Sequence, residues 1–121
     1  MLRHLRVSEL ARRDIRDIYV YTARTFGRDQ ARKYRSLIEQ ALVEIDEEPE
    51  RRGSKDLEEI GEGVRSYRLA LSAMSGGSTV KKPRHVIIYM RLQEDSWGVI
   101  RILHESMDFE RHIAEEGDFE S

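Results

Sequence analysis

Two apolar segments near the C-terminus, separated by a short polar turn, restrict the fold of this chain more than any other feature. Residues 84–91 read Arg-His-Val-Ile-Ile-Tyr-Met-Arg, and residues 97–104 run from Trp97 to His104. Both are rich in β-branched and aromatic side chains, which favour strands, and the short turn predicts a hairpin. Because the run from Val86 to Met90 is almost continuously apolar, we expect a central strand that is covered on both faces.

Two amphipathic helices are predicted in the first half of the chain. Ser8 is a suitable N-cap for the first helix, and Gly27 is a suitable residue for its end. The second helix begins near Arg28 and stops before Pro49. Apolar residues recur in both at helical spacing, and the link between the helices is very short. The two helices are therefore expected to be antiparallel neighbours, an αα-hairpin.

Two further strands are expected, at residues 2–7 and 64–71, from their alternation of apolar and polar residues. The resulting order is β-α-α-β-β-β. It predicts an α+β fold in which a small, antiparallel-rich sheet packs against the αα-hairpin. A length of 121 residues is typical of one domain, which we expect to span residues 1–121.

Three segments are predicted to lack regular structure for most of their length. Residues 46–63 form an acidic connecting loop with one short turn near residues 57–60, and residues 72–83 form a long polar hairpin loop. Residues 105–121 form a C-terminal tail. Within that tail, residues 108–116 are expected to make a helical turn, and residues 117–121 are expected to be frayed.

The composition predicts a cytoplasmic protein. The chain contains no cysteine, which fits a reducing compartment and excludes a disulfide framework or a thiolate site. Arg3, His4 and Arg6 interrupt any apolar run at the N-terminus, so no signal-peptide pattern is present. No stretch reaches the roughly 20 apolar residues of a membrane span. We therefore expect no membrane partner.

Charge is distributed in blocks of alternating sign, although the formal net charge is only −2. Residues 1–35 carry ten basic and four acidic side chains, and residues 36–63 carry three and ten. Residues 64–104 carry seven and two, and residues 105–121 carry one and seven. Such blocks can orient a charged partner. Solvated helix faces produce the same pattern, and the sequence leaves both explanations open.

Motifs for metal, cofactor or nucleophilic chemistry are missing from the sequence. There is no His-x-x-x-His or paired-cysteine spacing for a metal, and no Gly-x-Ser-x-Gly turn for a serine nucleophile. Gly76 and Gly77 lie in the expected hairpin loop, so they do not form a phosphate-binding loop that opens a helix. We expect neither a metal nor a cofactor.

Three motifs, in order along the chain, resemble the ParE branch of the ParE/RelE toxin superfamily. The motifs are Ser8-x-x-Ala11-x-x-Asp14-x-x-x-Ile18-x-x-Tyr21, then Gly63-Val64-Arg65-Ser66-Tyr67, then His104-x-x-Met107-Asp108-x-x-Arg111-His112. The first is followed by Phe26-Gly27. The expected order of helices and strands is similar to the fold of that superfamily, and the likeness covers most of the chain.

This resemblance implies a bacterial toxin of a type II toxin–antitoxin system, of the kind that maintains plasmids or chromosomes. Such a toxin inhibits DNA gyrase and blocks replication until a ParD-like antitoxin neutralises it. It would bind gyrase and stabilise a cleaved-DNA intermediate, so no catalytic residue is expected. No sequence-specific binding of nucleic acid by the toxin alone is expected either.

Two alternatives remain open. RelE-like members of the superfamily cut mRNA on the ribosome, and here that activity would use His104 with Arg65 or Arg101. Relatives with this activity tend to carry an arginine after the histidine of the third strand, whereas Val86 follows His85 in this chain. A valine cannot stabilise a phosphorane, so the gyrase inhibitor is favoured. The second alternative is a degenerate, non-toxic member that only binds its antitoxin.

The candidate partner-binding residues combine a basic segment before the third strand with the C-terminal motif. The long loop carries cations that can contact gyrase or DNA, although a tolerated surface insertion would look the same. His104 ends a strand and is the first residue of the motif. The full set is Arg65, Lys81, Lys82, Arg84, His104, Met107, Asp108, Phe109, Arg111 and His112.

Overall fold

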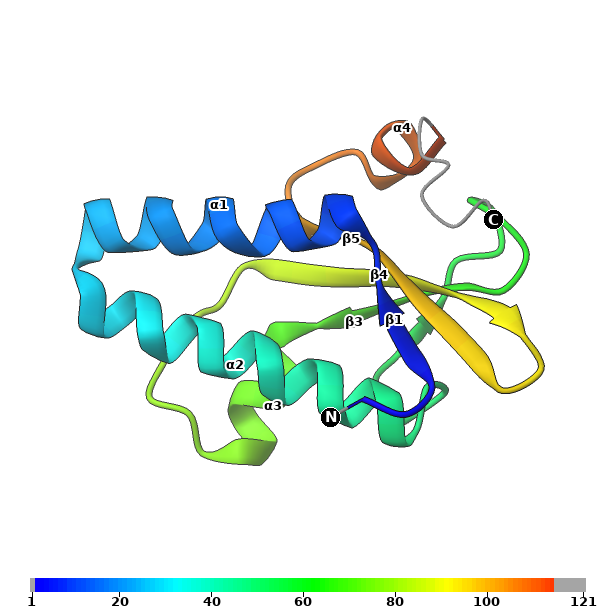
Figure 1. The fold of residues 1–121 in the computed structure, drawn as a ribbon, viewed down its shortest axis with the longest axis horizontal. Helices are drawn as coiled ribbons and strands as arrows, with labels where there is room; N and C mark the ends of the chain where they lie inside the picture. Colours follow the sequence, from blue (N-terminus) through cyan, green and yellow to red (C-terminus); the bar gives the residue numbers. More distant parts are fainter. Residues whose placement is uncertain (1, 115–121) are drawn as a thin grey trace.

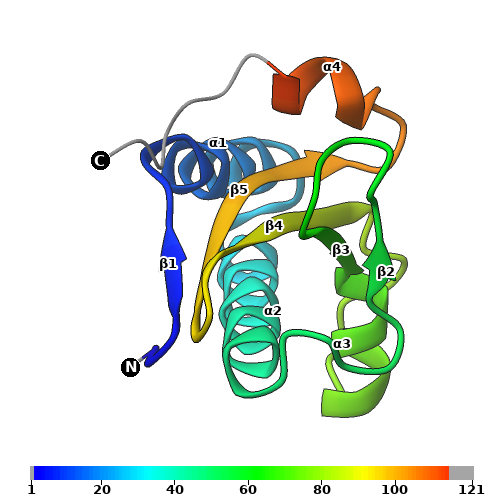
Figure 2. The ribbon, with the colours of Figure 1, turned by 90° about the vertical axis from the view of Figure 1, so that its right-hand side faces the viewer.

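The computed structural model describes residues 2–114. Its elements are β1 (Leu5–Val7), α1 (Glu9–Phe26), α2 (Arg28–Glu47), β2 (Lys55–Asp56), β3 (Val64–Arg68), α3 (Leu69–Gly76), β4 (His85–Gln93), β5 (Ser96–His104) and α4 (Phe109–Ala114). The strands form one sheet in the order β1-β5-β4-β3-β2. Only the β1–β5 pair is parallel. Helices α1 and α2 pack against one face of the sheet, and α4 covers part of the other (Figures 1 and 2).

The predicted αα-hairpin and α+β class are confirmed. The hydroxyl of Ser8 accepts a hydrogen bond from the amide of Ala11 at 3.0 Å, which caps the N-terminus of α1. Gly27 has a φ of 95° and its amide donates to the carbonyl of Ala23, which ends α1 and lets α2 begin at the next residue. These two residues fix where the helical hairpin starts and turns.

Strand β4 is central and buried on both faces, as its apolar sequence predicts. On one face, Ile87 and Tyr89 lie in a core shared with α1 and α2. On the other face, Val86 and Ile88 form a second core with β5. Phe109 of α4 packs against this second core, together with Leu57, Ile60, Met90 and Ile113. The sheet is therefore the middle layer between the helical hairpin and a thinner cover.

The prediction of a strand over residues 64–71 followed by a loop over residues 72–83 is wrong. The strand ends at Arg68, and helix α3 begins at Leu69 and ends at Gly76. Leu69 is fully buried in the helix-side core, so tertiary packing overrides the alternating pattern. Gly77, with a φ of 68°, caps the helix in the left-handed conformation. Between α3 and β4, residues 77–84 are irregular.

The other irregular segments contain more structure than the sequence predicted. Within residues 46–63, α2 continues to Glu47 and the two residues of β2 pair with β3. The expected turn is present, since the amide of Ile60 donates to the carbonyl of Leu57 at 2.9 Å. Helix α4 lies within the predicted span 108–116, whereas residues 117–121 lie outside the described residues. No helix in the part of the chain that is described is long and apolar enough to cross a membrane.

A buried carboxylate on α2 holds the N-terminal strand. The carboxylate of Asp46 accepts hydrogen bonds from the backbone amides of Arg3, His4 and Leu5, at distances from 2.7 to 3.1 Å. Burial acts to raise the pKa of Asp46, but the three amides outweigh it and lower the pKa below the usual 3.8. The charged carboxylate of Asp46 therefore stabilises the folded state fully at pH values above the usual pKa of 3.8. This contribution is lost as the pH falls through the lower pKa of the folded state.

Replacing this carboxylate should loosen the edge of the sheet. We expect Asp46→Ala to lower the free energy of unfolding at pH 7 by about 2 kcal/mol, because one buried and two partly buried amides lose a charged acceptor. Urea unfolding followed by circular dichroism measures the change. The matched control is Glu47→Ala, at the neighbouring exposed position of α2. Equal stability of the two variants would show that Asp46 does not anchor β1.

Candidate functional site

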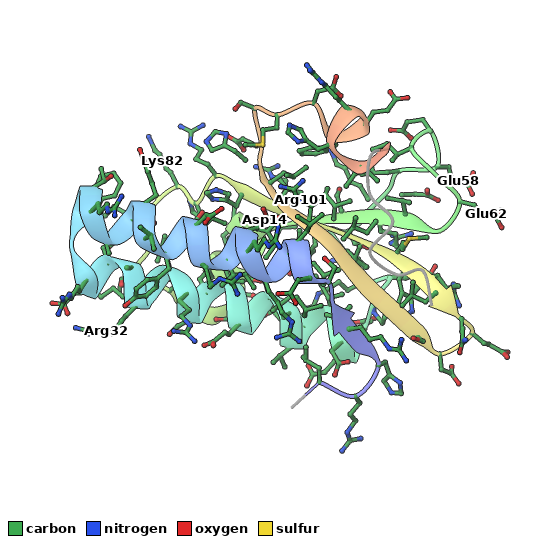
Figure 3. The ribbon with its side chains drawn as sticks, turned by 45° about the horizontal axis from the view of Figure 1, so that its top comes forward. Asp14, Arg32, Glu58, Glu62, Lys82 and Arg101 are labelled. Atoms are coloured by element: carbon green, nitrogen blue, oxygen red, sulfur yellow. The ribbon has the colours of Figure 1, made fainter. Side chains whose placement is uncertain are left out.

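Most of the predicted partner-binding residues lie at the end of the sheet where β4 begins and β5 ends. His85 of β4 pairs directly with His104 of β5. The guanidinium of Arg84 forms an ion pair with the carboxylate of Glu105 at 2.8 Å. Lys81 and Lys82, in the irregular segment that leads into β4, are exposed, and Figure 3 shows Lys82 projecting away from the molecule. Strand register thus brings the basic segment and the C-terminal motif together.

His85 is held in its neutral form at the centre of this end. Its Nδ1 atom lies 2.6 Å from the hydroxyl of Tyr34 on α2, and its ring meets the ring of His104 edge-on, with centroids 5.5 Å apart. Burial, assisted by the charge that His104 can carry, lowers the pKa of His85 to about 4. Burial also raises the pKa of Tyr34 to about 12. At neutral pH the pair is uncharged and serves to position the strand ends.

One ring nitrogen of His104 is held by Ser106. The amide of Ser106 donates to its Nδ1 atom at 3.1 Å, and the hydroxyl of Ser106 lies 2.7 Å from the same atom. Because Nδ1 is an acceptor, the neutral ring carries its proton on Nε2. The side chain is half-buried, so His104 can donate a hydrogen bond to a partner at the surface.

The C-terminal motif folds back onto the sheet. The carboxylate of Asp108 accepts from the amide of Arg111 at 3.3 Å, as a residue that caps α4 does. Phe109 packs on the second core, so these two positions mainly hold the helix in place. Met107 is 44% exposed, Arg111 is exposed and His112 is half-buried. Together with His104, these three side chains are accessible to a partner and do not hold α4 in place.

Arg65 lies apart from the other candidates. It pairs with Tyr89 in the middle of β4, and its guanidinium donates to the hydroxyl of Ser54 at 2.8 Å. It lines a surface cavity of about 530 Å³, together with Glu58 and Glu62, which stand on the segment between β2 and β3 (Figure 3). Sequence reasoning placed Arg65 in the same group as the C-terminal motif, and the structure separates them.

Arg101 forms an ion pair with Asp14 of α1. Its guanidinium donates to both carboxylate oxygens of Asp14, at 2.8 and 2.9 Å, and the two side chains are only 18% and 12% exposed. The amide of Ile102 also donates to Asp14 at 2.9 Å, so this carboxylate covers the part of the β5 edge that β1 leaves open. Figure 3 shows the two side chains together where α1 crosses β5.

The three residues of the ribonuclease alternative do not meet at one site. His104 and Arg65 pair with positions 85 and 89 of β4. Four residues of strand separate those positions, which is about 13 Å along the sheet. Arg101 pairs with Ile88, whose side chain lies on the face opposite to that of His85. A phosphodiester bound at His104 would therefore meet neither arginine.

Sequence reasoning missed two residues that contact the candidate site residues, Tyr34 and Asp14. The helical spacing of Tyr34 predicted packing alone, yet its hydroxyl contacts His85. Asp14 belongs to a quoted motif, and its carboxylate borders the apolar stripe of α1, which is an unusual place for a charge and was the available signal. Within residues 2–114, no three His, Asp or Glu side chains gather closely enough to hold a metal ion.

The buried state of His85 predicts a pH dependence. Because its pKa is about 4 when folded and about 6.5 when unfolded, the unfolded chain binds more protons between these values. Stability should therefore rise with pH across this window. We expect His85→Asn to reduce the change in unfolding free energy between about pH 4.5 and 7. An NMR titration of the His85 ring that gives a pKa near 6.5 would contradict the argument.

Comparison with known proteins agrees with this architecture. The solved structure described as "Chromosomal ParDE TA system from P. aeruginosa" is similar to this chain, with a TM-score of 0.63 and 16% sequence identity. The likeness covers 85% of this chain and 96% of that one, and it confirms the predicted fold. No curated protein matches the sequence. The family model of the ParE toxin of the type II toxin–antitoxin system parDE matches residues 5–109. The chain therefore belongs to the ParE toxin family of type II toxin–antitoxin systems.

Proposed function

We propose that this chain inhibits DNA gyrase in the cytoplasm, that it thereby blocks replication, and that a ParD-like antitoxin neutralises it. The match to the ParE toxin family over residues 5–109 is the observation that carries this proposal. Gyrase as the target follows from the resemblance of the motifs. The family match extends from β1 to the start of α4, so we take the chain to act as one toxin domain.

Binding without chemistry fits the arrangement of the polar residues. His85 is neutral and bonded to Tyr34, and Arg101 is tied to Asp14. General acid–base cleavage of a phosphodiester needs a proton donor together with a cation that stabilises the developing charge. The separation of His104 from Arg65 leaves that pair unavailable. These positions favour a toxin that acts through its surface.

The surface that we assign to partner contact lies at the end of the sheet. It consists of the exposed or half-buried residues around the β4 start and the β5 end, namely Lys81, Lys82, Arg84, His104, Met107, Arg111 and His112. Most of these side chains are cationic or can become so, and one is an exposed methionine, which adapts to irregular partner surfaces. Asp108 and Phe109 contribute by holding α4 in place.

A gyrase assay tests this function directly. Added to purified gyrase and supercoiled plasmid, the chain is expected to produce linear, gyrase-linked DNA, because a poison stabilises the cleaved intermediate. Adding the antitoxin should suppress that product. Absence of any effect on gyrase, at amounts that still arrest growing cells, would contradict the proposal.

A variant of His104 distinguishes partner binding from catalysis. We expect His104→Ala to arrest growth at an expression level within about tenfold of the level that the wild type needs, since loss of one surface hydrogen bond costs only about 0.5–1.5 kcal/mol. Transcript cleavage is measured in parallel in a translating extract. If cleavage between codons occurs and disappears in His104→Ala, the ribonuclease function replaces gyrase inhibition.

A further inference from the structure

A surface groove lies between α2 and residues 77–79, the segment that follows α3, and it shares no residue with the surface assigned above to partner contact. Its volume of about 400 Å³ is within the size range of small-molecule sites. Figure 1 shows the segment passing alongside α2 on its way from α3 to β4. We call this feature the Lys33 groove. Its lining includes Arg32, Lys33, Ser36 and Leu37 from α2, and Ser78 and Thr79 from the segment after α3.

The Lys33 groove is positively charged. Among the described residues, its lining contains two cations and no carboxylate, whereas the cavity beside Arg65 is lined by four acidic residues. Lys33 forms no ion pair within residues 2–114. Arg32, which Figure 3 shows near the end of the helical hairpin, pairs with Asp29 at 2.6 Å. Their side chains are 63% and 88% exposed, so water screens that pair and an anion can replace it.

Hydroxyl groups line both walls of the Lys33 groove. The side chains of Ser36 on α2 and of Thr79 on the opposite wall are exposed, and they donate no hydrogen bond to any group of residues 2–114. The hydroxyl of Ser78 accepts from the amide of Val80 at 3.1 Å, which leaves its own hydrogen available. A ligand between the walls therefore meets hydrogen-bond donors from two directions.

Both walls of the Lys33 groove are fixed before anything binds. Leu37 and Val80 are buried in the helix-side core, where they anchor α2 and the segment after α3. The side-chain amide of Gln40 donates to the carbonyl of Ser72 on α3 at 2.9 Å, and to a carboxylate of its own helix at 3.0 Å. Because both hydrogens of that amide are used, Gln40 holds α3 against α2 and adds no donor to the groove. A preformed site lowers the entropic cost of binding.

We propose that the Lys33 groove binds a terminal phosphate group, as carried by a phosphate monoester or a diphosphate. Such a group bears about two negative charges and three strong acceptor oxygens, which point in different directions. Arg32 and Lys33 supply the opposite charge, and the hydroxyls of Ser36, Ser78 and Thr79 can bond the oxygens from both walls. A carboxylate has only two oxygens, which lie in one plane, so an acidic peptide uses fewer of these donors.

The lining selects the phosphate group and little else of the ligand. No aromatic ring lines the groove in the part of the chain that the structure describes, so stacking does not hold a base. A nucleic acid polymer needs a basic surface that extends along many phosphates, and two cations in a groove do not provide one. The assignment goes beyond the gyrase function proposed above and does not depend on it.

Titration of the full-length chain with pyrophosphate tests this assignment. We expect saturable binding in calorimetry at physiological ionic strength, with NMR amide shifts concentrated on residues 32–37 and 77–79. A nucleoside diphosphate that binds equally well identifies the phosphate group itself as the ligand, and tighter binding identifies an organic phosphate ester. Both results support the site. Absence of saturable binding, or shifts centred on Lys81 and Lys82, would overturn it.

Two variants test the two walls separately. We expect Lys33→Gln to weaken pyrophosphate binding by about tenfold or more, because a charge-assisted contact is lost. Thr79→Val removes one hydroxyl at nearly constant shape and should weaken binding by about threefold. The matched control is Lys55→Gln, which changes an exposed lysine of β2 outside the groove and should bind within about twofold of wild type.

The comparison of these variants separates a built site from general attraction by surface charge. Equal affinity of Lys33→Gln and Lys55→Gln, or unchanged affinity of Thr79→Val, would overturn the groove. The gyrase assay described above uses none of these residues, so failure of the phosphate site leaves the proposed function intact.

Discussion

Helix α2 holds the start of β4, helix α3 and the N-terminal strand in place. Its apolar stripe, which includes Ile38, Ala41 and Ile45, is buried at 0–1% exposure against the sheet. Polar residues beside the stripe extend the attachment in three directions. Tyr34 contacts His85 at the start of β4, Glu44 accepts from α3, and Asp46 accepts from the amides that lead into β1. Because one helix holds all three, a shift of α2 would move the start of β4, α3 and β1 together.

In this arrangement, the buried carboxylates hold the fold together, whereas exposed cations are accessible to partners. Buried or half-buried carboxylates, such as Asp14 and Asp46, accept two or more hydrogen bonds each and cover backbone donors at the sheet edge. Exposed cations such as Lys33 and Lys82 make no ion pair within residues 2–114. A folded domain with a net charge of only −2 can therefore still present basic surfaces. Such surfaces orient a charged protein partner and speed its association, as a toxin that must meet an antitoxin requires.

Helix α3 shows how tertiary packing decides the structure of a segment that the sequence does not predict to be helical. The residues after β3 turn inward because Leu69 enters the core and Ser72 is fully buried beside Glu44. The similar ParDE structure, at 16% identity, shares the fold over most of both chains.

The sequence by itself determined the α+β class, the helical hairpin with its Ser8 cap and Gly27 turn, and the central position of β4. Each follows from local periodicity or from backbone preferences that act within a few residues. Only the tertiary structure decided that residues 69–76 form a helix and that Arg65 lies far from His104. It alone decided that the guanidinium of Arg101 pairs with the carboxylate of Asp14. These outcomes depend on strand register and on contacts between residues 28 to 87 positions apart, which no local pattern encodes.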